Sequence, residues 1–360
     1  MMNRKIGLLI PVAIVICIMF YFNPNCIFTN ENGGNYRQST DEFNPDIRQE
    51  NSLTKDYKQQ GMKTWKSSNP SFGTLILKWF SKQTSNNHSQ QTRIKPGNFT
   101  KKNNVLSYSL FGKNSFKKYK KNIISVLTEA RKSFLYHSWT VRIYTDIIIP
   151  PKFIKKMHHT NPKVQLVNVT KLGHAYPNLQ RINAMIWRFL PMCDPTVAVS
   201  CFRDLDSPLY KREEHAVREF LYTDYIFHGM RDNPYHTSLV MGGMWCYRNL
   251  KNQQLGQMLL NLILQKAQHR FPNVREANKG DDQTVLNRHL WPVIKNDALV
   301  HDSFFCSRSN KPKAIRPFPT KRQRSEPFVG CATRPCEYDF KMLKCPSKCR
   351  PKEHQNWKYC

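Results

Sequence analysis

From residue 104 onward, short apolar runs typical of strands alternate with segments in which apolar residues recur at helical spacing. Residues 105–112, 141–145 and 164–169 are apolar and β-branched, and each run predicts a strand. Between them, residues 123–135 place apolar side chains at helical spacing, and residues 150–158 open on a proline that suits a first helical turn. Strands and helices that alternate with short links predict an α/β fold, with a mostly parallel sheet covered by helices.

The same alternation continues less regularly along the rest of the chain. We expect a helical segment over 180–189 that is closed by Pro191, and a strand over 197–202. Further on, the pattern predicts helices over 212–222, 253–269 and 281–290, short strands around Gly242-Gly243 within 225–247, and a strand over 297–300.

The N-terminus carries an uncharged run over residues 6–22, about 17 residues and so near the lower limit for a membrane helix. Arg4 and Lys5 precede it, and no basic residue follows until Arg37, so the positive-inside rule puts residues 1–5 in the cytoplasm. A cleaved signal peptide is the alternative. We expect a signal anchor, and hence a single-pass type II membrane protein with the rest of the chain across the membrane.

Composition divides the remaining chain. Residues 23–103 are rich in Asn, Gln, Ser, Thr and Lys, and we interpret them as a disordered stem. We expect a folded α/β domain over 104–306 and a basic, cysteine-rich C-terminal extension over 307–360.

The cysteines are consistent with an oxidising compartment. Of the 11 cysteines, Cys17 lies in the apolar run, and an even number remains. A zinc ribbon would need two tight cysteine pairs, so we expect disulfides, whose connectivity the spacing leaves open. Asn87, Asn98 and Asn168 begin glycosylation sequons. Five cysteines gather in the C-terminal extension: Cys331, Cys336, Cys345, Cys349 and Cys360.

The net charge is strongly positive, with 56 Lys and Arg against 25 Asp and Glu, which gives +31. Such an excess indicates anionic partners, including an acidic acceptor, or a solvated stem and tail. No zinc-finger spacing, basic zipper or RNA-binding aromatic motif accompanies the charge, so no nucleic acid is expected.

Two aspartates follow the strand predicted over 197–202. Side chains two positions apart point the same way at a strand end, so Asp204 and Asp206 can offer oxygens to one hard cation, Mg²⁺ or Mn²⁺. An ordinary solvated turn is the alternative. In an open, mostly parallel sheet, ligands bind at the carboxyl ends of strands, where these residues fall.

Three motifs support a resemblance. Trp187-Arg188-Phe189-Leu190-Pro191 and an apolar strand precede Asp204-Leu205-Asp206, and Met241-Gly242-Gly243-Met244-Trp245 and Lys279-Gly280-Asp281-Asp282-Gln283 follow. Over residues 104–306 the chain resembles nucleotide-sugar-dependent glycosyltransferases of the GT-A fold, and in particular animal type II membrane proteins with a glycosyltransferase-like domain. Arg203 departs from the family pattern, where an apolar or small residue is usual.

The resemblance implies a GT-A-like sheet, a UDP-linked donor, a glycan or glycoprotein acceptor, and roles for the site residues. It implies Asp204 and Asp206 as metal ligands, with Asp206 the more direct one, and His301 as the candidate third ligand. Arg188 or Arg203 would contact phosphate or ribose. The alternatives are a salt bridge from either arginine to a site carboxylate, and a packed histidine at 301.

The later motifs supply the remaining candidates. Gly243 suggests close backbone approach to a ligand, beside Trp245 as an aromatic plate for a sugar. Asp281, Asp282 and Gln283 would lie near the acceptor or orient the sugar, and either aspartate would be the general base if the enzyme inverts. An ordinary turn with a core tryptophan, and a helix N-cap, are the alternatives.

Two other functions fit parts of the pattern. A relative that binds glycan or another anionic ligand without turnover would share the fold. A sulfotransferase or phosphodiesterase would also act on anionic substrates, but residues 110–115 make a poor phosphate-binding loop because they lack the second glycine and the Lys-Ser/Thr pair.

Overall fold

The computed structural model describes residues 102–112, 114–172, 176, 179–270, 280–307, 312, 314–322, 327–332 and 344–359. The expected cytoplasmic tail and membrane anchor, and all but the last two residues of the expected stem, lie outside the described residues. Within the part that is described, no helix is both long enough and apolar enough to cross a membrane.

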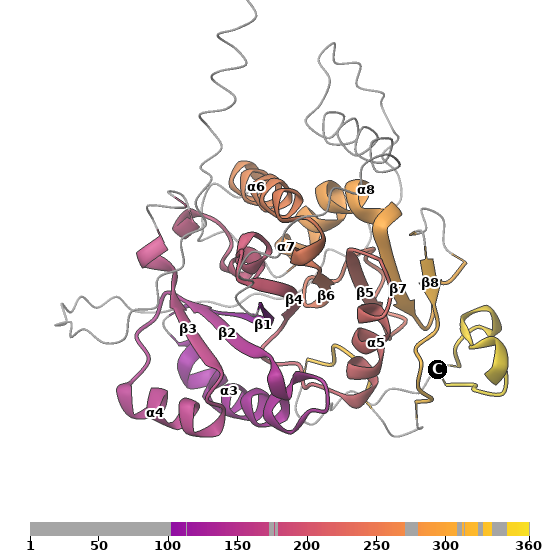
Figure 1. The fold of residues 1–360 in the computed structure, drawn as a ribbon, viewed down its shortest axis with the longest axis horizontal. Coiled ribbons are helices and arrows are strands. Elements are labelled where there is room, and N and C mark those ends of the chain that lie inside the picture. The colour runs from indigo at the N-terminus through magenta and orange to yellow at the C-terminus, as the bar shows by residue number, and fades with distance from the viewer. Residues whose placement is uncertain are drawn as a thin grey trace, which may run out of the picture. The chain divides into compact units, whose positions relative to one another are not determined.

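A mixed sheet of eight strands, in the order β3-β2-β1-β4-β6-β5-β7-β8, forms the centre of the described chain (Figure 1). Every neighbouring pair is parallel except the two that involve β6, so the prediction of a mostly parallel sheet is confirmed. The strands are β1 (Asn103–Leu110), β2 (Thr140–Thr145), β3 (Val164–Asn168), β4 (Val197–Arg203), β5 (Phe227–Arg231), β6 (Met244–Tyr247), β7 (Ala298–Asp302) and β8 (Ala314–Arg316).

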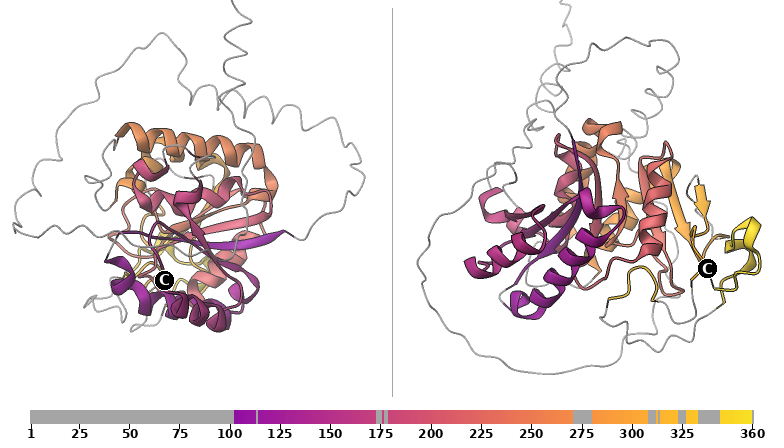
Figure 2. Two further views of the ribbon diagram at one scale, coloured as in Figure 1. Left: turned by 90° about the vertical axis from the view of Figure 1, so that its left-hand side faces the viewer. Right: turned by 60° about the horizontal axis from the view of Figure 1, so that its bottom comes forward.

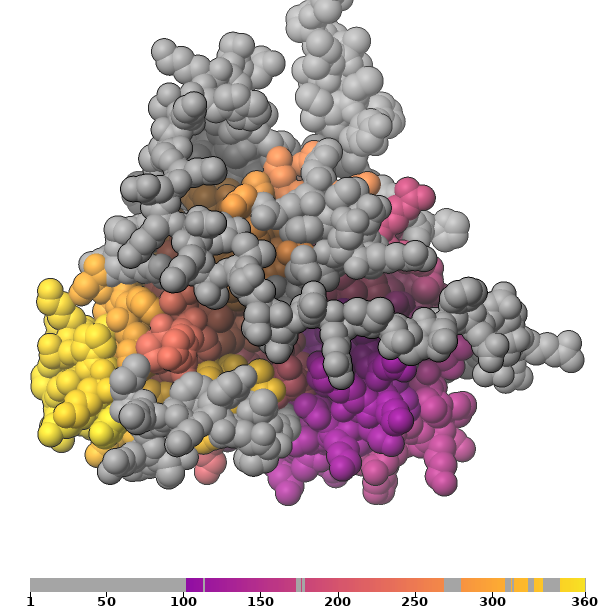
Figure 3. Space-filling model, turned by 180° about the vertical axis from the view of Figure 1, so that it is seen from behind, coloured from indigo at the N-terminus to yellow at the C-terminus, as the bar shows by residue number. Residues whose placement is uncertain are grey.

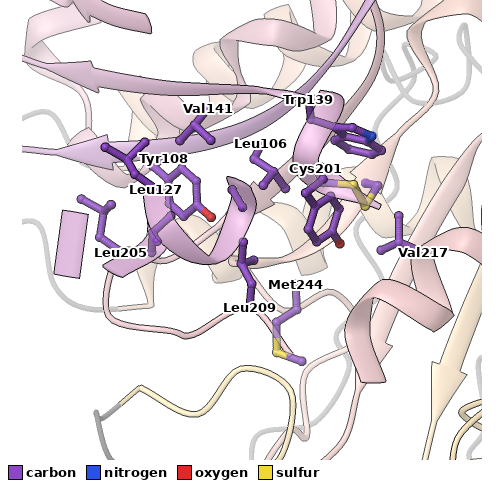
Figure 4. Close-up of a cluster of buried hydrophobic side chains, with 14 of the residues drawn as sticks. Leu106, Tyr108, Leu127, Trp139, Val141, Cys201, Leu205, Leu209, Val217 and Met244 are labelled. Carbon is purple, nitrogen blue, oxygen red and sulfur yellow. A yellow bond between two sulfur atoms is a disulfide. The ribbon is translucent and has the colours of Figure 1, made fainter. Parts of the chain in front are cut away.

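One face of the sheet is covered by α3 (Ser115–Lys132), α4 (Pro151–Thr160) and α5 (Lys211–Leu221). Alternate strand residues such as Leu106, Val141 and Cys201 join Leu127 of α3 and Val217 of α5 in one buried cluster (Figure 4). α4 and α5 lie within two residues of their predicted bounds because their apolar positions recur at a period of 3.6 residues, whereas α3 begins eight residues before the predicted 123–135 and ends three residues earlier.

The opposite face is covered by the 3₁₀ segment η4 (Ala184–Cys193) and by α6 (Gln253–Arg270), which lies across it (Figure 2). Phe189 of η4 packs on Phe202 and Trp245 of the sheet, with ring centroids 5.2 and 5.3 Å apart. Gly256 lets α6 approach closely, because a Cβ there would overlap the carbonyl oxygen of Met192. The site described below lies between η4 and the carboxyl end of β4.

The helical segment predicted over 180–189 differs from the structure in type and bounds. It is a 3₁₀ helix over Ala184–Cys193, and Pro191 lies inside it rather than closing it. Its start is fixed by Asn183, whose side chain accepts a hydrogen bond from the backbone N–H of Met185 at 2.9 Å. A capping amide therefore decides the boundary, which apolar spacing does not reveal.

The helix predicted over 281–290 continues further than expected. It consists of α7 (Asp281–Val285), a π-helical turn η7 (Leu286–Leu290) and α8 (Trp291–Ile294). Pro292 does not stop the backbone, because it lies in the first turn of α8, where proline is tolerated.

Residues of the expected C-terminal extension take part in the sheet and its packing. β8 pairs with β7, and Asp232, which follows β5, accepts the backbone N–H of Val329 at 3.1 Å. A disulfide joins Cys306 to Cys349, and a second joins Cys201 to Cys246, which face each other across β4 and β6. Disulfides expected from the cysteine content are therefore present.

Candidate functional site

The site begins where β4 ends. Asp204 directly follows the strand, and 44% of its side-chain surface is exposed. The carbonyl oxygen of Asp204 accepts the backbone N–H of Ser207 at 3.1 Å, which closes a turn that carries Asp206, itself partly exposed. The structure thus places both aspartates at the carboxyl end of a central strand, as predicted from the sequence.

Arg188 reaches this turn from η4. Two serines of β1 hold its backbone, because Ser107 Oγ donates to the carbonyl oxygen of Arg188 at 2.6 Å and the N–H of Arg188 donates to Ser109 Oγ at 3.0 Å. Its guanidinium donates through Nη1 to Asp204 Oδ1 and through Nη2 to Asp282 Oδ2. Of the alternatives weighed for Arg188, the structure shows the salt bridge to site carboxylates.

The charges of this triad depend on burial. Burial by itself would lower the pKa of the Arg188 guanidinium, but Asp204 and Asp282 outweigh it, so the pKa rises and the group stays cationic. Burial raises the pKa of Asp282, and Arg188 opposes that rise. Arg188 is therefore a fixed positive charge between a buried carboxylate and a half-exposed one.

Asp282 is placed by the start of α7. Gly280 precedes the helix with φ of +94°, a left-handed conformation that glycine adopts without strain, and its carbonyl accepts the N–H of Thr284 at 2.9 Å. Asp281 and Asp282 are the first two residues of the helix. Asp282 is buried and Asp281 is partly exposed, so the two neighbouring aspartates have different environments.

The loop before β6 is held against the same helix. Gln283 Oε1 accepts the N–H of Gly242 at 3.3 Å, and Gln283 Nε2 donates to Ser238 Oγ at 2.7 Å. One turn further on, Asn287 Oδ1 accepts the N–H of Val240 at 3.0 Å, and Asn287 Nδ2 donates to the carbonyl of Val240 at 2.8 Å. In this conformation Gln283 orders the loop.

Both glycines of this loop lie against the triad. A Cβ on Gly242 would overlap Asp282 Oδ2 and lie 2.9 Å from Arg188 Nη2. A Cβ on Gly243 would overlap the carboxylate of Asp204. The backbone of Gly243 therefore lies close to Asp204 and that of Gly242 close to Asp282, while approach of Gly243 to a ligand stays a prediction.

Arg203 does not lie with these groups. Its side chain is buried on the α5 face of the sheet and pairs with Glu213 at 2.8 Å. It also donates to the backbone, through Nη1 to the carbonyl of Gly243 at 2.9 Å and through Nη2 to that of Pro208 at 3.3 Å. The predicted contact of Arg203 with phosphate or ribose is therefore corrected: it supports the site from beneath, because neighbouring strand residues face opposite sides of the sheet.

His301 also lies on the α5 face. It is buried on β7, where Nδ1 bonds His228 Nε2 at 2.8 Å and Nε2 bonds Glu219 Oε2 at 3.1 Å. Two strands separate β7 from β4. In this arrangement His301 does not join Asp204 as a third ligand, and the described residues hold no group of three His, Cys, Asp or Glu that could bind a metal ion.

Trp245 has no ring face exposed for a sugar. It is 1% exposed and packs on Phe202, with ring centroids 4.3 Å apart. The role of sugar plate is therefore corrected to that of a core tryptophan, because the position following Met244 on β6 points into the η4 layer.

Sequence reasoning missed the residues that hold the triad in place. Ser107 and Ser109 are two positions apart on β1, so both lie on the same face of the strand. Two polar residues on one face of a buried strand could have indicated hydrogen-bonding partners there. Ser238 and Asn287 carried no such signal, since their contacts join segments more than 40 residues apart.

The chain is similar to known proteins in structure but not detectably in sequence. No protein-family model matches the chain, and no curated protein matches it in sequence. Similar solved structures include mouse xyloside xylosyltransferase 1 in its apo form, with a TM-score of 0.37 and 10% identity over 57% of this chain and 86% of that one.

Two further similar structures are microbial. Core-mannan synthase A of Aspergillus fumigatus, in an Mn/GDP form, has a TM-score of 0.33 and 10% identity over 66% of this chain and 82% of that one. The mannosyltransferase PcManGT of Pyrobaculum calidifontis, with GDP-Man and Mn²⁺, has a TM-score of 0.30 and 12% identity over 51% and 54%. Two of the three are named as sugar transferases and one as a mannan synthase, and their TM-scores run from 0.30 to 0.37.

Proposed function

We propose that this protein is a glycosyltransferase that moves a sugar from a nucleotide-sugar donor to a glycan or glycoprotein acceptor. One observation carries the proposal: Arg188 bridges Asp204, at the exit of β4, and Asp282, at the start of α7, beside two glycines. Transfer from a nucleotide sugar leaves a diphosphate with growing negative charge, and fixed cationic groups beside that charge stabilise the transition state.

Asp204 and Asp206 fit a divalent cation. Magnesium and manganese prefer oxygen ligands and are often held by one or two carboxylates, with substrate phosphates and waters completing the shell. Asp204 is half-exposed, and the backbone of Gly243 packs against one side of its carboxylate. We infer that these two residues hold Mn²⁺ or Mg²⁺ without His301, and that the bound ion would neutralise charge on the departing nucleotide.

Arg188 and Asp282 act together in this proposal. The pKa of the Arg188 guanidinium is raised, so the group stays charged at the pH of the compartment. It can therefore give up its hydrogen bond to one carboxylate and bind a phosphate or hydroxyl of the donor instead. The raised pKa of Asp282 favours proton acceptance, which an inverting reaction requires of Asp281 or Asp282. In a retaining reaction the same carboxylates orient the sugar.

We place the catalytic domain in the lumen of the secretory pathway, anchored to the Golgi membrane. The uncharged N-terminal run supports an anchor, and disulfides such as Cys201–Cys246 and Cys306–Cys349 suit an oxidising compartment. Asn168, in the sequon Asn168-Val169-Thr170, is exposed at the end of β3, as glycosylation requires.

A second candidate is a protein that binds a glycan or another anionic ligand without turnover. The observation that favours it is the triad itself, because Arg188 already neutralises both carboxylates, as a purely structural ion pair would. Both candidates share the fold, so only activity separates them.

The test is hydrolysis or transfer by purified full-length protein with a panel of UDP- and GDP-sugars and Mn²⁺. We expect turnover of one donor and loss of donor binding in Asp206→Ala, with Asp224→Ala as the control because the side chain of Asp224 is 99% exposed and pairs with Lys251. Turnover unchanged in Asp206→Ala would refute the metal assignment, and donor binding without turnover would favour the second candidate.

A further inference from the structure

The outer surface of α3 and α4 is strongly basic. The two helices lie next to each other on one face of the sheet, where Phe116 packs on Phe153 with ring centroids 4.9 Å apart (Figure 1). Figure 3 shows the surface they help to form, in indigo to magenta. Eight lysines of the helices are exposed: Lys117, Lys118, Lys120, Lys121 and Lys132 of α3, and Lys152, Lys155 and Lys156 of α4. We call these eight residues the lysine surface.

The lysine surface is not balanced by carboxylates. From Ser115 to Thr160 the only acidic residues are Glu129 and Asp146. Glu129 is partly buried, and accepts hydrogen bonds from Ser125 Oγ and from the N–H of Leu209, both at 2.9 Å. Among the described residues, none of the eight lysines forms an ion pair.

The arrangement is unfavourable to the helices themselves. Neither helix has an acidic residue in its first turn, where Lys117 and Lys118 of α3 and Lys152 of α4 lie close to the positive end of the helix dipole. Lys117 and Lys121 are four residues apart, as are Lys152 and Lys156, so like charges face each other on adjacent turns. A surface that breaks these local rules without compensation inside the protein points to an anion from outside.

We propose that the lysine surface binds a linear polysaccharide that carries sulfate or carboxylate groups. Lysines occupy both ends of α3, and 15 residues separate Lys117 from Lys132, a span of about 22 Å at the helical rise. A charged chain of several sugar units matches such a strip. Lysine acts as a point charge rather than a bidentate fork, which suits many dispersed anionic groups.

The exposed hydrophobic residues argue against a membrane or a single-stranded nucleic acid as the partner. A helix that lies on a membrane inserts apolar side chains, and single strands stack on aromatic rings. Among the described residues, the exposed large hydrophobic side chains all lie outside α3 and α4: Phe111, Phe134, Ile148, Tyr222, Tyr235 and Leu250. The lysine surface therefore offers charge without apolar anchors.

The test compares two variants with the same change in net charge. The first is Lys117→Glu/Lys121→Glu/Lys152→Glu/Lys156→Glu. The control, Lys344→Glu/Lys348→Glu/Lys352→Glu/Lys358→Glu, reverses four exposed lysines of the C-terminal region. Binding of a labelled heparin octasaccharide to full-length protein is measured by fluorescence anisotropy at low salt. We expect the first variant to bind about tenfold more weakly or worse, and the control to change by about twofold at most.

Equal weakening in both variants would overturn the proposal, since it would show dependence on net charge alone. It would also be overturned if wild-type protein bound phosphatidylserine vesicles or duplex DNA as tightly as heparin. Circular dichroism checks that the variant folds, and the milder Lys→Gln set at the same four positions replaces it if it does not. Donor turnover is not needed for this readout, so the result is independent of the proposed transferase reaction.

Discussion

Gly243 lies directly against the carboxylate of Asp204, with no room for a methyl group between them. The φ angle of Gly243 is not in the left-handed region, so steric contact rather than backbone conformation requires glycine. The backbone of Gly243 is itself fixed, because its carbonyl accepts Arg203 Nη1 at 2.9 Å. A side chain at this position must therefore displace the aspartate.

The first prediction follows for Gly243→Ala. We expect donor binding in the presence of Mn²⁺ to be lost, because the new methyl group moves the carboxylate of Asp204 away from the proposed cation site. The free energy of unfolding should fall by only about 1–3 kcal/mol. Calorimetric titration with the donor and urea denaturation measure the two effects. Gly229→Ala is the control, since its Cβ would lie 3.4 Å from Val300. Normal donor affinity in Gly243→Ala would show that Asp204 is not needed where it lies.

The second prediction concerns Arg188→Met. Removal of the guanidinium leaves Asp282 buried without its counter-charge, and we expect a loss of about 3 kcal/mol in the free energy of unfolding near neutral pH. The pKa of Asp282 is already raised, and it rises further without Arg188, so the destabilisation should grow as pH rises and shrink as Asp282 is protonated. Urea denaturation at several pH values measures this trend.

Two further variants separate stability from function at this site. Asp282→Asn added to Arg188→Met should restore part of the stability, because the buried charge is gone. Arg142→Met breaks another buried pair, with Asp194 at 2.7 Å, and should cost stability while donor affinity of the folded protein is kept. Equal donor affinity in Arg188→Met and Arg142→Met would contradict a role for Arg188 in donor binding.

The alternating pattern predicts the strands of the first half of the sheet well, and β1, β2 and β3 pair in chain order, whereas β4 pairs with β1. β1 to β4 are each a short apolar run followed by a link, and their parallel pairing follows from the helices between them. The position of β6 between β4 and β5 depends on contacts between distant segments. β8 has only three residues and lies in a basic stretch, so no local signal distinguishes it.

The site divides in the same way. Asp204, Asp206 and Asp282 are candidates because a strand end and a helix start mark them, and Arg188 is one because it belongs to a motif of the resemblance. The roles of Arg203 and His301 depend on which helix covers which face, and the sequence does not give this. Both point to α5, where Glu213 and Glu219 meet them. Charge complementarity across the fold therefore decides which basic residue reaches the site.

The third prediction concerns the disulfide between Cys201 and Cys246. It closes a loop with a sequence separation of 45 residues, and it joins β4 and β6 close to the site, since Cys201 precedes Asp204 by three residues and Cys246 follows Gly243 by three. We expect Cys201→Ala/Cys246→Ala to lower the free energy of unfolding by about 4 kcal/mol through the larger entropy of the unfolded chain. Cys306→Ala/Cys349→Ala is the matched control away from β4, and only the first variant should also weaken donor binding.

The fourth prediction concerns acid stability and His236. Its imidazole is buried and accepts the backbone N–H of Asp232 at Nδ1, at 3.2 Å, and burial lowers its pKa from 6.5 to about 4, which Asp232 only partly opposes. A depressed pKa stabilises the folded protein above pH 6.5, and this stability is lost as pH falls from 6.5 to 4, by about 3 kcal/mol in total.

The variant that tests this is His236→Asn, because asparagine offers a hydrogen-bond acceptor but does not titrate. Between pH 6.5 and pH 4 its free energy of unfolding should fall by about 3 kcal/mol less than that of wild type. Burial raises the pKa of Glu213 to about 7, so Glu213 adds stability as pH falls, opposite to His236. Glu213 is present in both proteins, so its contribution cancels in the difference between their free energies of unfolding. Urea denaturation of both proteins at pH 7 and pH 4 gives that difference, and parallel stability curves would show that His236 does not stay neutral in the folded state.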